Sequence, residues 1–428
     1  MIIFIMIAFV ALIAVGMPIA FGIGVAGVFT ILLSGGLPLM LVPQRMVTQL
    51  DSYALLAVPY FILAGYLMER GGISERLYAF SNALTRHWRG GLAQSTMVAS
   101  IIMSGLSGSG VADISAIGAV AVPGMRKKGY KPSFIAAVLS AGGFLGPIIP
   151  PSIMMIVYGS ITNVSIGALF VSGIIPGLIL GFSFMGMIWW LAGRLQYSGE
   201  TRASLREVWQ TFREAFWALI APIILVGGIV SGVFTPTEGG AIAALYAFLV
   251  GTFVYRELKP KHYFEIFVQS GLLTGGILII IATAALFGWL LNRLHFPQMV
   301  VDFLFSITRN PTLVLMLIIV VLLAVGMVVE TLAAAIILIP VLDPLATQFG
   351  FNSVHFAFVI ILALQLGTVH PPVGVYLFLA NRMAGGRLED SVIAVLPFIV
   401  VMIAVLFLVA IFPQMALYLP SMFYASAR

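Results

Sequence analysis

The sequence contains no cysteine, and only 8% of its 428 residues are charged. The absence of cysteine excludes disulfide bonds, zinc sites with cysteine ligands, iron–sulfur clusters and thiol catalysis. The shortage of charge excludes an ordinary soluble domain, in which about 25% of residues are charged. The apolar segment 1–15 also lacks a basic stretch before it, so we interpret it as part of a retained first helix and not as a cleaved secretory signal.

Apolar residues are abundant in place of charged ones and make up 61% of the chain. A helix needs about 20 predominantly apolar residues to cross the hydrocarbon core of a lipid bilayer. The chain has many such runs, so we predict an all-α polytopic membrane protein. Full crossings are expected at 3–33, 53–68, 134–162, 168–192, 215–232, 238–254, 271–291, 354–380 and 392–417.

Two further apolar segments, 92–125 and 311–345, are interrupted near their middles by small or polar residues. Residues 104–110 interrupt the first, and Gly326 with Glu330 and Thr331 interrupts the second. Each half is about 15 residues long, or about 22 Å of helix, which is short for a crossing. We interpret both segments as re-entrant helical hairpins. The alternative is one long kinked crossing for each.

The positions of lysine and arginine agree with this topology, because both are enriched in cytoplasmic loops. With both hairpins re-entrant, most of the 21 basic residues fall on one side, together with the loops that flank the first hairpin. The exceptions are Arg45, Arg293, Arg309 and Arg428. The exit of the second hairpin, 343–355, has no Lys or Arg, so the two hairpins enter from opposite faces. Topology thus explains the net charge of +6, and no nucleic acid is expected as a partner.

Two sets of corresponding residues recur in the two halves of the chain, each set with its own constant spacing. Asp113 and Pro123 correspond in this way to Glu330 and Pro340. A second set recurs likewise: Gly146, Pro150, Pro151 and Pro176 correspond to Gly367, Pro371, Pro372 and Pro397. The order of features and the opposite entry of the hairpins predict an inverted repeat.

This repeat divides the chain into three parts. The predicted parts are a first repeat over 1–192, with hairpin 92–125 and broken helix 134–162; an amphipathic connector and extra crossing over 193–237; and a second repeat over 238–428, with hairpin 311–345 and broken helix 354–380.

The paired prolines at 150–151 and 371–372 are predicted to break their helices, because proline lacks an N–H and clashes with the preceding turn. Irregular backbone at membrane depth is tolerated only against protein or a water-filled cavity. Paired broken helices therefore point to a binding site, in which freed carbonyls suit a cation such as Na⁺ and helix N-termini suit an anion. The alternative is an ordinary proline kink in each helix.

Five polar residues are candidates for substrate contacts. Asp113 and Glu330 lie at membrane depth, where acids are unfavourable and usually functional, although each could instead cap its hairpin arm. His370 either donates to a substrate carboxylate or only packs. Asn163 and Asn381 follow the broken helices and are either polar substrate contacts or helix C-caps.

A remote alternative is an intramembrane serine protease. Residues 105–108, Gly-Leu-Ser-Gly, match the Gly-x-Ser-Gly of the rhomboid type, which needs a histidine base near the serine. His355 and His370 are the only histidines in plausible helices. The protease interpretation leaves the repeat, the second hairpin and both proline pairs unexplained, so we expect the chain not to be an enzyme.

Four motifs together resemble a known family, the large membrane subunit of tripartite ATP-independent periplasmic (TRAP) transporters. They are the runs 104–118 (SGLSGSGVADISAIG), 123–130 (PGMRKKGY), 146–152 (GPIIPPS) and 235–240 (TPTEGG). The resemblance covers nearly the whole chain, and the combination of motifs is specific.

The resemblance implies Na⁺-coupled import of an organic acid, of the C4-dicarboxylate or sialic acid class, across the bacterial inner membrane. It implies two partners, a periplasmic substrate-binding protein and a small four-helix membrane subunit, here expected as a separate polypeptide. It also implies an elevator mechanism, with a scaffold and a transport domain that contains both hairpins and both broken helices. A stand-alone sodium/dicarboxylate elevator symporter is the alternative transporter class.

Carried onto this sequence, the resemblance places two sodium sites where hairpin turns meet broken helices. Substrate is expected between the hairpin tips, with Asp113 nearby. The first sodium site comprises Ser104, Ser107, Gly108, Gly146, Ile149 and Pro150, and the second comprises Gly326, Thr331, Thr368 and Pro371.

Overall fold

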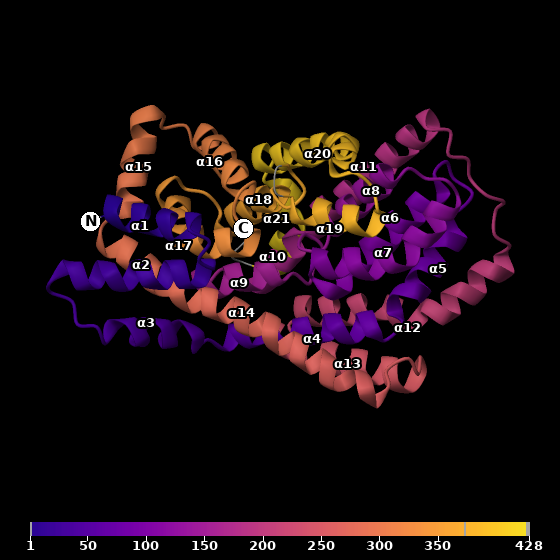
Figure 1. Cartoon of the computed structure of the whole chain (residues 1–428), viewed down its shortest axis with the longest axis horizontal. Helices are drawn as coiled ribbons and strands as arrows, with labels where there is room; N and C mark the ends of the chain where they lie inside the picture. The colour runs from indigo at the N-terminus through magenta and orange to yellow at the C-terminus, as the bar shows by residue number, and fades with distance from the viewer. Residues whose placement is uncertain (1, 372–373, 425–428) are drawn as a thin grey trace.

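Helices make up most of the computed structural model, which describes residues 2–371 and 374–424 (Figure 1). No strand occurs in these two ranges. The elements in chain order are α1 (Ile2–Ala14), α2 (Ile19–Ser34), α3 (Leu41–Leu50), η1 (Tyr53–Leu56), α4 (Ala57–Arg70), α5 (Ile73–Thr85), α6 (Gly91–Ser107), α7 (Gly110–Lys127), α8 (Pro132–Phe144), α9 (Ile153–Thr162), α10 (Ile166–Ser172), α11 (Ile174–Arg194), α12 (Leu205–Val230), α13 (Pro236–Leu249), η2 (Val250–Val254), α14 (Pro260–Arg293), α15 (Phe296–Ile307), α16 (Pro311–Gly326), α17 (Thr331–Gln348), α18 (Ser353–Leu366), α19 (Val375–Ala384), α20 (Leu388–Ile411) and α21 (Gln414–Phe423).

The helices have the lengths that a multi-pass membrane protein needs. Among the described residues, six helices are long and apolar enough to cross a bilayer, or up to eight if each bent pair counts as one span. The bent pairs are α3 with α4, which turn by 62°, and α15 with α16, which turn by 119°. This confirms the predicted all-α, polytopic membrane class.

The segment 92–125 forms two helices that pack along each other, as expected for a hairpin and not for one kinked crossing. The chain turns at Gly108, whose φ of 63° favours glycine, and the Ser109 side chain then caps α7 by accepting from Ala112 N. The following helix is broken where the prolines predicted it, because α8 ends at Phe144 and α9 begins at Ile153.

The second half also contains a helix–turn–helix and a broken helix, but its two hairpin arms are splayed. α16 lies mainly against α18 and touches α17 only slightly, whereas α6 and α7 are in extensive contact. The break in the second helix falls between Leu366 and Val375, as expected. Pro372, the second proline of that pair, lies outside the described residues.

The predicted single crossing over 3–33 is wrong. The chain instead forms α1 and α2, which pack against each other around a break at residues 15–18. Gly16 has a φ of 90°, and Pro18 has no N–H to continue a helix, so these two residues reverse the chain.

Within the predicted connector and extra crossing, 193–237, the structure forms one long helix, α12, which begins at Leu205 because Ser204 caps it by accepting from Glu207 N. Two other predicted boundaries are wrong. α17 continues to Gln348, so Asp343 lies within a helix and not in an exit loop. The last crossing ends at Ile411 and is followed by the short helix α21.

The half-helices α8 and α18 form the centre of the molecule. All residues from Phe134 to Phe144 in α8 are buried, as are all residues from Val354 to Leu366 in α18. A helix that is apolar on all sides is stable only when other elements surround it completely. Both backbone breaks therefore lie inside the protein, next to the hairpin turns.

Candidate functional site

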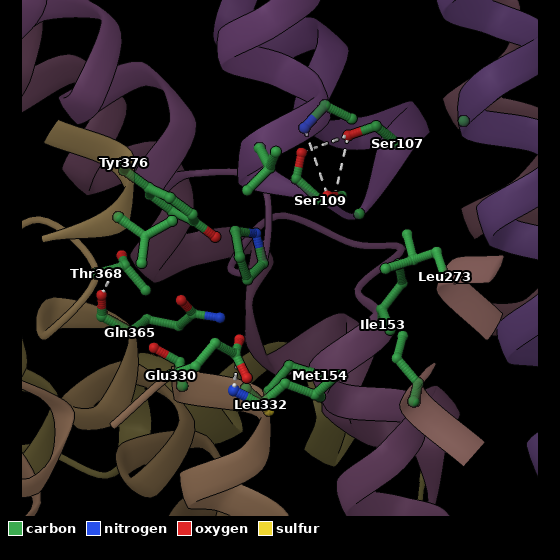
Figure 2. Close-up of a pocket in the computed structure, with 18 of the residues that line it drawn as sticks. Ser107, Ser109, Ile153, Met154, Leu273, Glu330, Leu332, Gln365, Thr368 and Tyr376 are labelled. Atoms are coloured by element: carbon green, nitrogen blue, oxygen red, sulfur yellow. Dashed lines mark hydrogen bonds between the residues drawn. The ribbon is translucent and has the colours of Figure 1, made fainter. Parts of the chain in front are cut away.

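A cavity of about 660 Å³ lies where the two hairpin turns meet the two broken helices. Figure 2 shows side chains from both halves of the chain around it, with Ser107 and Ser109 on the first half and Glu330, Gln365 and Thr368 on the second. A further wall comes from α4 and α14, which contribute Phe61, Ile62, Gly65, Tyr66, Glu69, Leu273 and Ile277.

Asp113 is the centre of a buried polar cluster behind the first hairpin turn. It lies in the first turn of α7 and is only 1% exposed. Ser104 Oγ donates to Asp113 Oδ2 at 3.0 Å, and Ser107 Oγ donates to Asp113 Oδ1 at 2.5 Å. A Cβ atom on Gly146 would stand 2.8 Å from Asp113 Oδ2, so the first backbone break passes directly against this carboxylate.

Contacts with the first break hold the hairpin turn in place. Ile153 N donates to Gly108 O at 3.5 Å, and a Cβ atom on Gly108 would stand 2.7 Å from the Pro151 carbonyl oxygen. The Pro150 carbonyl faces Gly105 on α6, while the Ile149 side chain packs against Gly177 on α11. The predicted meeting of 104–108 with 146–150 is therefore present in the structure.

Three of the four residues of the second predicted cluster, Gly326, Thr331 and Thr368, line the same cavity. Gly326 lies in backbone contact with Gly367, and Thr331 Oγ1 donates to Leu364 O at 3.4 Å. Thr368 Oγ1 donates to Gln365 O at 2.6 Å, and Thr368 O accepts from Tyr376 N at 2.9 Å. Pro371 is close by in sequence, and its carbonyl lies 2.6 Å from His370 Nδ1.

The two predicted acids have different positions. Asp113 does not line the cavity and lies behind Ser107. Glu330 does line it, and at the same time it is the N-cap of α17, where it accepts from Leu332 N at 3.0 Å and from Ala333 N at 2.9 Å. Of the two roles open to Glu330 from sequence, the capping role is the one that its contacts display.

The other predicted polar contacts lie away from this cavity. Asn163 is a helix C-cap with a φ of 60° and lines a separate pocket near Tyr424. Asn381 is not a C-cap, because α19 continues past it to Ala384; its Oδ1 accepts from Ser391 Oγ at 2.7 Å. His370 is not among the described residues that line the cavity.

The histidines offer no base for Ser107. His355 Nε2 lies 2.9 Å from Val409 O, and His370 Nδ1 lies 2.6 Å from Pro371 O. Ser107 instead donates to Asp113. A serine nucleophile with a hydrogen-bonded histidine is thus not present among the described residues.

Sequence reasoning missed several polar residues that line the cavity, among them Glu69, Tyr66 and Gln365. Glu69 and Tyr66 come from α4, and Gln365 comes from α18 with a buried Oε1 that has no hydrogen-bond partner among the described residues. Gln365 was detectable in principle, because it is a polar residue within an otherwise apolar half-helix. Glu69 gave a weaker signal, since Arg70 beside it makes the pair resemble an ordinary helix end.

The cavity therefore has an unusual charge balance for a site that would hold an acid. Its described lining contains two carboxylates, Glu69 and Glu330, and no Lys, Arg or His. An anion bound there would have to be held by N–H and hydroxyl donors, and by cations that are not part of the chain.

Comparison with known proteins gives the same family as the motifs. The family model described as "Tripartite ATP-independent periplasmic transporter, DctM component" matches residues 6–415. All the relatives described below are named as permease proteins, and none is named as an enzyme.

Three curated relatives cover nearly the whole chain. The sialic acid TRAP transporter large permease protein SiaM of Vibrio cholerae is 37% identical over 95% of this chain and 96% of its own length. The 2,3-diketo-L-gulonate TRAP transporter large permease protein YiaN of Escherichia coli is 36% identical over 94% of this chain and 95% of its own length. The C4-dicarboxylate TRAP transporter large permease protein DctM of Pseudomonas aeruginosa is 36% identical over 93% of this chain and 93% of its own length.

Proposed function

The chain belongs to the DctM family, the large permease component of TRAP transporters, and we propose that it imports an organic acid anion together with Na⁺. It is a multi-pass membrane transport protein and not an enzyme. The observation that carries the proposal is the cavity in which both hairpin turns and both broken helices meet without a basic side chain in the described lining. In such a site Na⁺ supplies the positive charge that the carboxylate of the substrate requires.

We assign the sodium ions to the two predicted clusters. The first site uses the hydroxyl groups of Ser104 and Ser107 with backbone carbonyls of the adjacent break. The second uses the region where Gly326 and Thr331 meet Thr368. Hydroxyl, carboxylate and carbonyl oxygens are the ligands that a hard cation prefers. In support, Ser104 and Ser107 both donate to Asp113, and Thr331 donates to the Leu364 carbonyl next to the second break. Asp113 supplies the negative charge of the first site.

The transport cycle follows from the cost of moving charge. An empty or half-filled polar site exposes unpaired dipoles to hydrocarbon, whereas bound Na⁺ and substrate offset one another. We assign the hairpins and broken helices to a mobile transport domain of an elevator built from an inverted repeat, with 1–192 and 238–428 as its halves and 193–237 as the link. Each net positive charge that moves inward gains about 2.3 kcal/mol per 100 mV.

The proposed system has two further components, a small four-helix membrane subunit and a periplasmic substrate-binding protein, with this chain in the bacterial inner membrane. Relatives named for sialic acid, 2,3-diketo-L-gulonate and C4-dicarboxylates support an organic acid as the substrate. The name of the family, which includes the words tripartite and periplasmic, supports a system of three components with delivery from that compartment.

Reconstitution tests the proposal directly. The chain and its small subunit are placed in proteoliposomes, and uptake of N-acetylneuraminate or succinate is measured with the binding protein outside. We expect uptake that requires an inward Na⁺ gradient and that falls to background when K⁺ replaces Na⁺. Uptake that is equal with either cation overturns sodium coupling. Full uptake without the binding protein identifies a stand-alone symporter instead.

A further inference from the structure

A second cavity, of about 350 Å³, lies between α3, α14, α17 and the end of α9. In Figure 1, α3 and α17 lie in the half of the molecule that contains the N-terminus, and the long helix α14 runs into this half from the side of α4 and α13. None of its lining residues belongs to the main cavity. Its polar lining consists of Arg45, Thr48, Gln49, Thr162, Asn292 and Asp343.

Arg45 contributes the only positive charge among the described residues that line this cavity. Its guanidinium carbon lies 4.9 Å from the centre of the Trp289 ring, and its Nε is buried without a hydrogen-bond partner among the described residues. No ion pair of the described residues includes Arg45. Stacking on an aromatic face leaves the in-plane N–H donors of the arginine guanidinium free. These paired N–H donors form a fork that matches the two oxygens of a carboxylate.

Asp343 lines the same cavity from α17 and is half-buried. The described part of the chain contains no ion pair between Asp343 and Arg45, although both face the same space. The hydroxyl of Tyr158 is within electrostatic range of Asp343, is fully buried, and also lacks a hydrogen-bond partner in the described ranges. The cavity thus combines a free cationic donor on α3 with a free carboxylate acceptor on α17.

We propose that this second cavity is a substrate subsite for a hydroxylated monocarboxylate, whose carboxylate binds Arg45 and whose hydroxyl group donates to Asp343. The inference rests on the proposed function and narrows its substrate class. A dicarboxylate is disfavoured, because its second carboxylate would face Asp343 without a cation between them. The volume falls within the range of small-molecule sites, about 300–1,000 Å³.

The ring of Trp289 gives a local signal for binding, since it lines the cavity beneath Arg45. The probe is N-acetylneuraminate, added to the purified full-length chain in lipid nanodiscs without Na⁺ or partner proteins. We expect a saturable change in tryptophan fluorescence that is absent in Trp289→Phe. Succinate at the same concentrations is expected to give no change.

Charge variants test each side of the subsite. Arg45→Gln removes a charge-assisted hydrogen bond and is expected to weaken binding about tenfold to a hundredfold. Arg293→Gln is the matched control, because Arg293 also lies over the Trp289 ring, at 5.8 Å, but does not line the cavity. It is expected to leave the affinity unchanged. Asp343→Asn is expected to admit succinate while N-acetylneuraminate still binds.

Several outcomes overturn the proposal. If Arg45→Gln and Arg293→Gln behave alike, or if Trp289→Phe keeps the signal, the cavity is not the subsite. If Asp343→Asn still excludes succinate, the assigned substrate class is wrong. Should Arg45→Gln fail to fold, Arg45→Lys preserves the charge without the fork and is expected to weaken binding; an unchanged affinity there also refutes the assignment. Loss of Na⁺-coupled uptake with an intact Trp289 signal refutes the proposed function and not the subsite.

Discussion

Gly146 lies so close to Asp113 that a Cβ atom on residue 146 would stand 2.8 Å from the carboxylate oxygen Oδ2. The same atom would also stand 2.8 Å from the backbone nitrogen of Gly110. The first broken helix and the first hairpin are therefore fitted together at a position where only glycine leaves enough space. This contact joins the first hairpin and the first broken helix. From the sequence alone, only their motifs indicate that these two segments belong to one site.

Gly146→Ala is expected to separate the hairpin turn from the break. Relief of the overlap requires shifts of backbone atoms, which destabilise a packed core by about 1–3 kcal/mol. We expect loss of uptake together with a lower unfolding temperature. Gly124→Ala in α7 is the matched control, since a Cβ atom there meets nothing within 4 Å. Equal effects of the two substitutions would show that the close approach of Gly146 to Asp113 matters neither for uptake nor for stability.

Ser107→Ala combined with Thr368→Ala removes one hydroxyl from each proposed sodium site. We expect a higher Na⁺ concentration for half-maximal uptake, with protein abundance nearly unchanged. Ser160→Ala is the control, because Ser160 donates only to Val157 O in its own helix and lines neither of the two cavities discussed above. An unaltered Na⁺ dependence at normal expression would remove both residues from the coupling mechanism.

Asp113→Ala is expected to abolish uptake, because it removes the negative charge that we assign to the first proposed sodium site. Asp113→Asn separates charge from hydrogen bonding: its amide oxygen can still accept from one of the two serine hydroxyls, and its amide NH2 can donate to the other. The fold is therefore expected to persist while Na⁺-dependent uptake is lost. Retained transport in Asp113→Asn would instead make Asp113 a structural residue that orders the turn. Thermal unfolding in detergent, with and without Na⁺, measures the two effects independently.

The positions of the hairpin turns and breaks were predictable because they depend on local chemistry. Glycine at 108 permits a left-handed turn, and proline at 150 and 151 removes donors from the helix ladder, whatever the surrounding fold. The cavity that they form was predictable only in outline. Whether a side chain such as Gln365 points into it depends on how a half-helix is rotated within the core.

The sequence predictions that were wrong depend on packing between helices, which local patterns do not determine. Residues 3–33 are apolar enough for one crossing, and only the packing of α1 against α2 distinguishes a reversal from a kink. The splaying of α16 from α17 arises because α16 packs on α18, a partner that no local pattern specifies. Asn381 was expected to end a helix, but its side chain accepts from Ser391 of the following helix, which a linear sequence does not display.

Glu330 variants test whether its role is to cap α17 or to bind substrate. Glu330→Asp retains a strong N-cap residue, so uptake and substrate affinity are expected to remain close to those of the unmodified chain. Glu330→Ala leaves Leu332 N and Ala333 N without their acceptor and is expected to destabilise the protein by about 1 kcal/mol. A large rise in KM for substrate in Glu330→Asp, without loss of stability, would instead indicate direct contact with the ligand.

Tyr376 connects the two halves of the site, because its ring lies where a Cβ atom on Gly110 would stand, 2.5 Å from the ring carbon Cζ. Tyr376→Ala is expected to lower the free energy of unfolding by about 3–5 kcal/mol, as for other large buried rings. Phe184→Ala is the control for stability alone, since Phe184 is fully buried but does not line the cavity. If the ring aligns the second break with the first hairpin, Tyr376→Ala lowers uptake more than Phe184→Ala at a similar unfolding temperature. Tyr376→Phe retains the ring and is expected to preserve most uptake; equal losses in the two alanine variants would mean that Tyr376 acts only as a core residue.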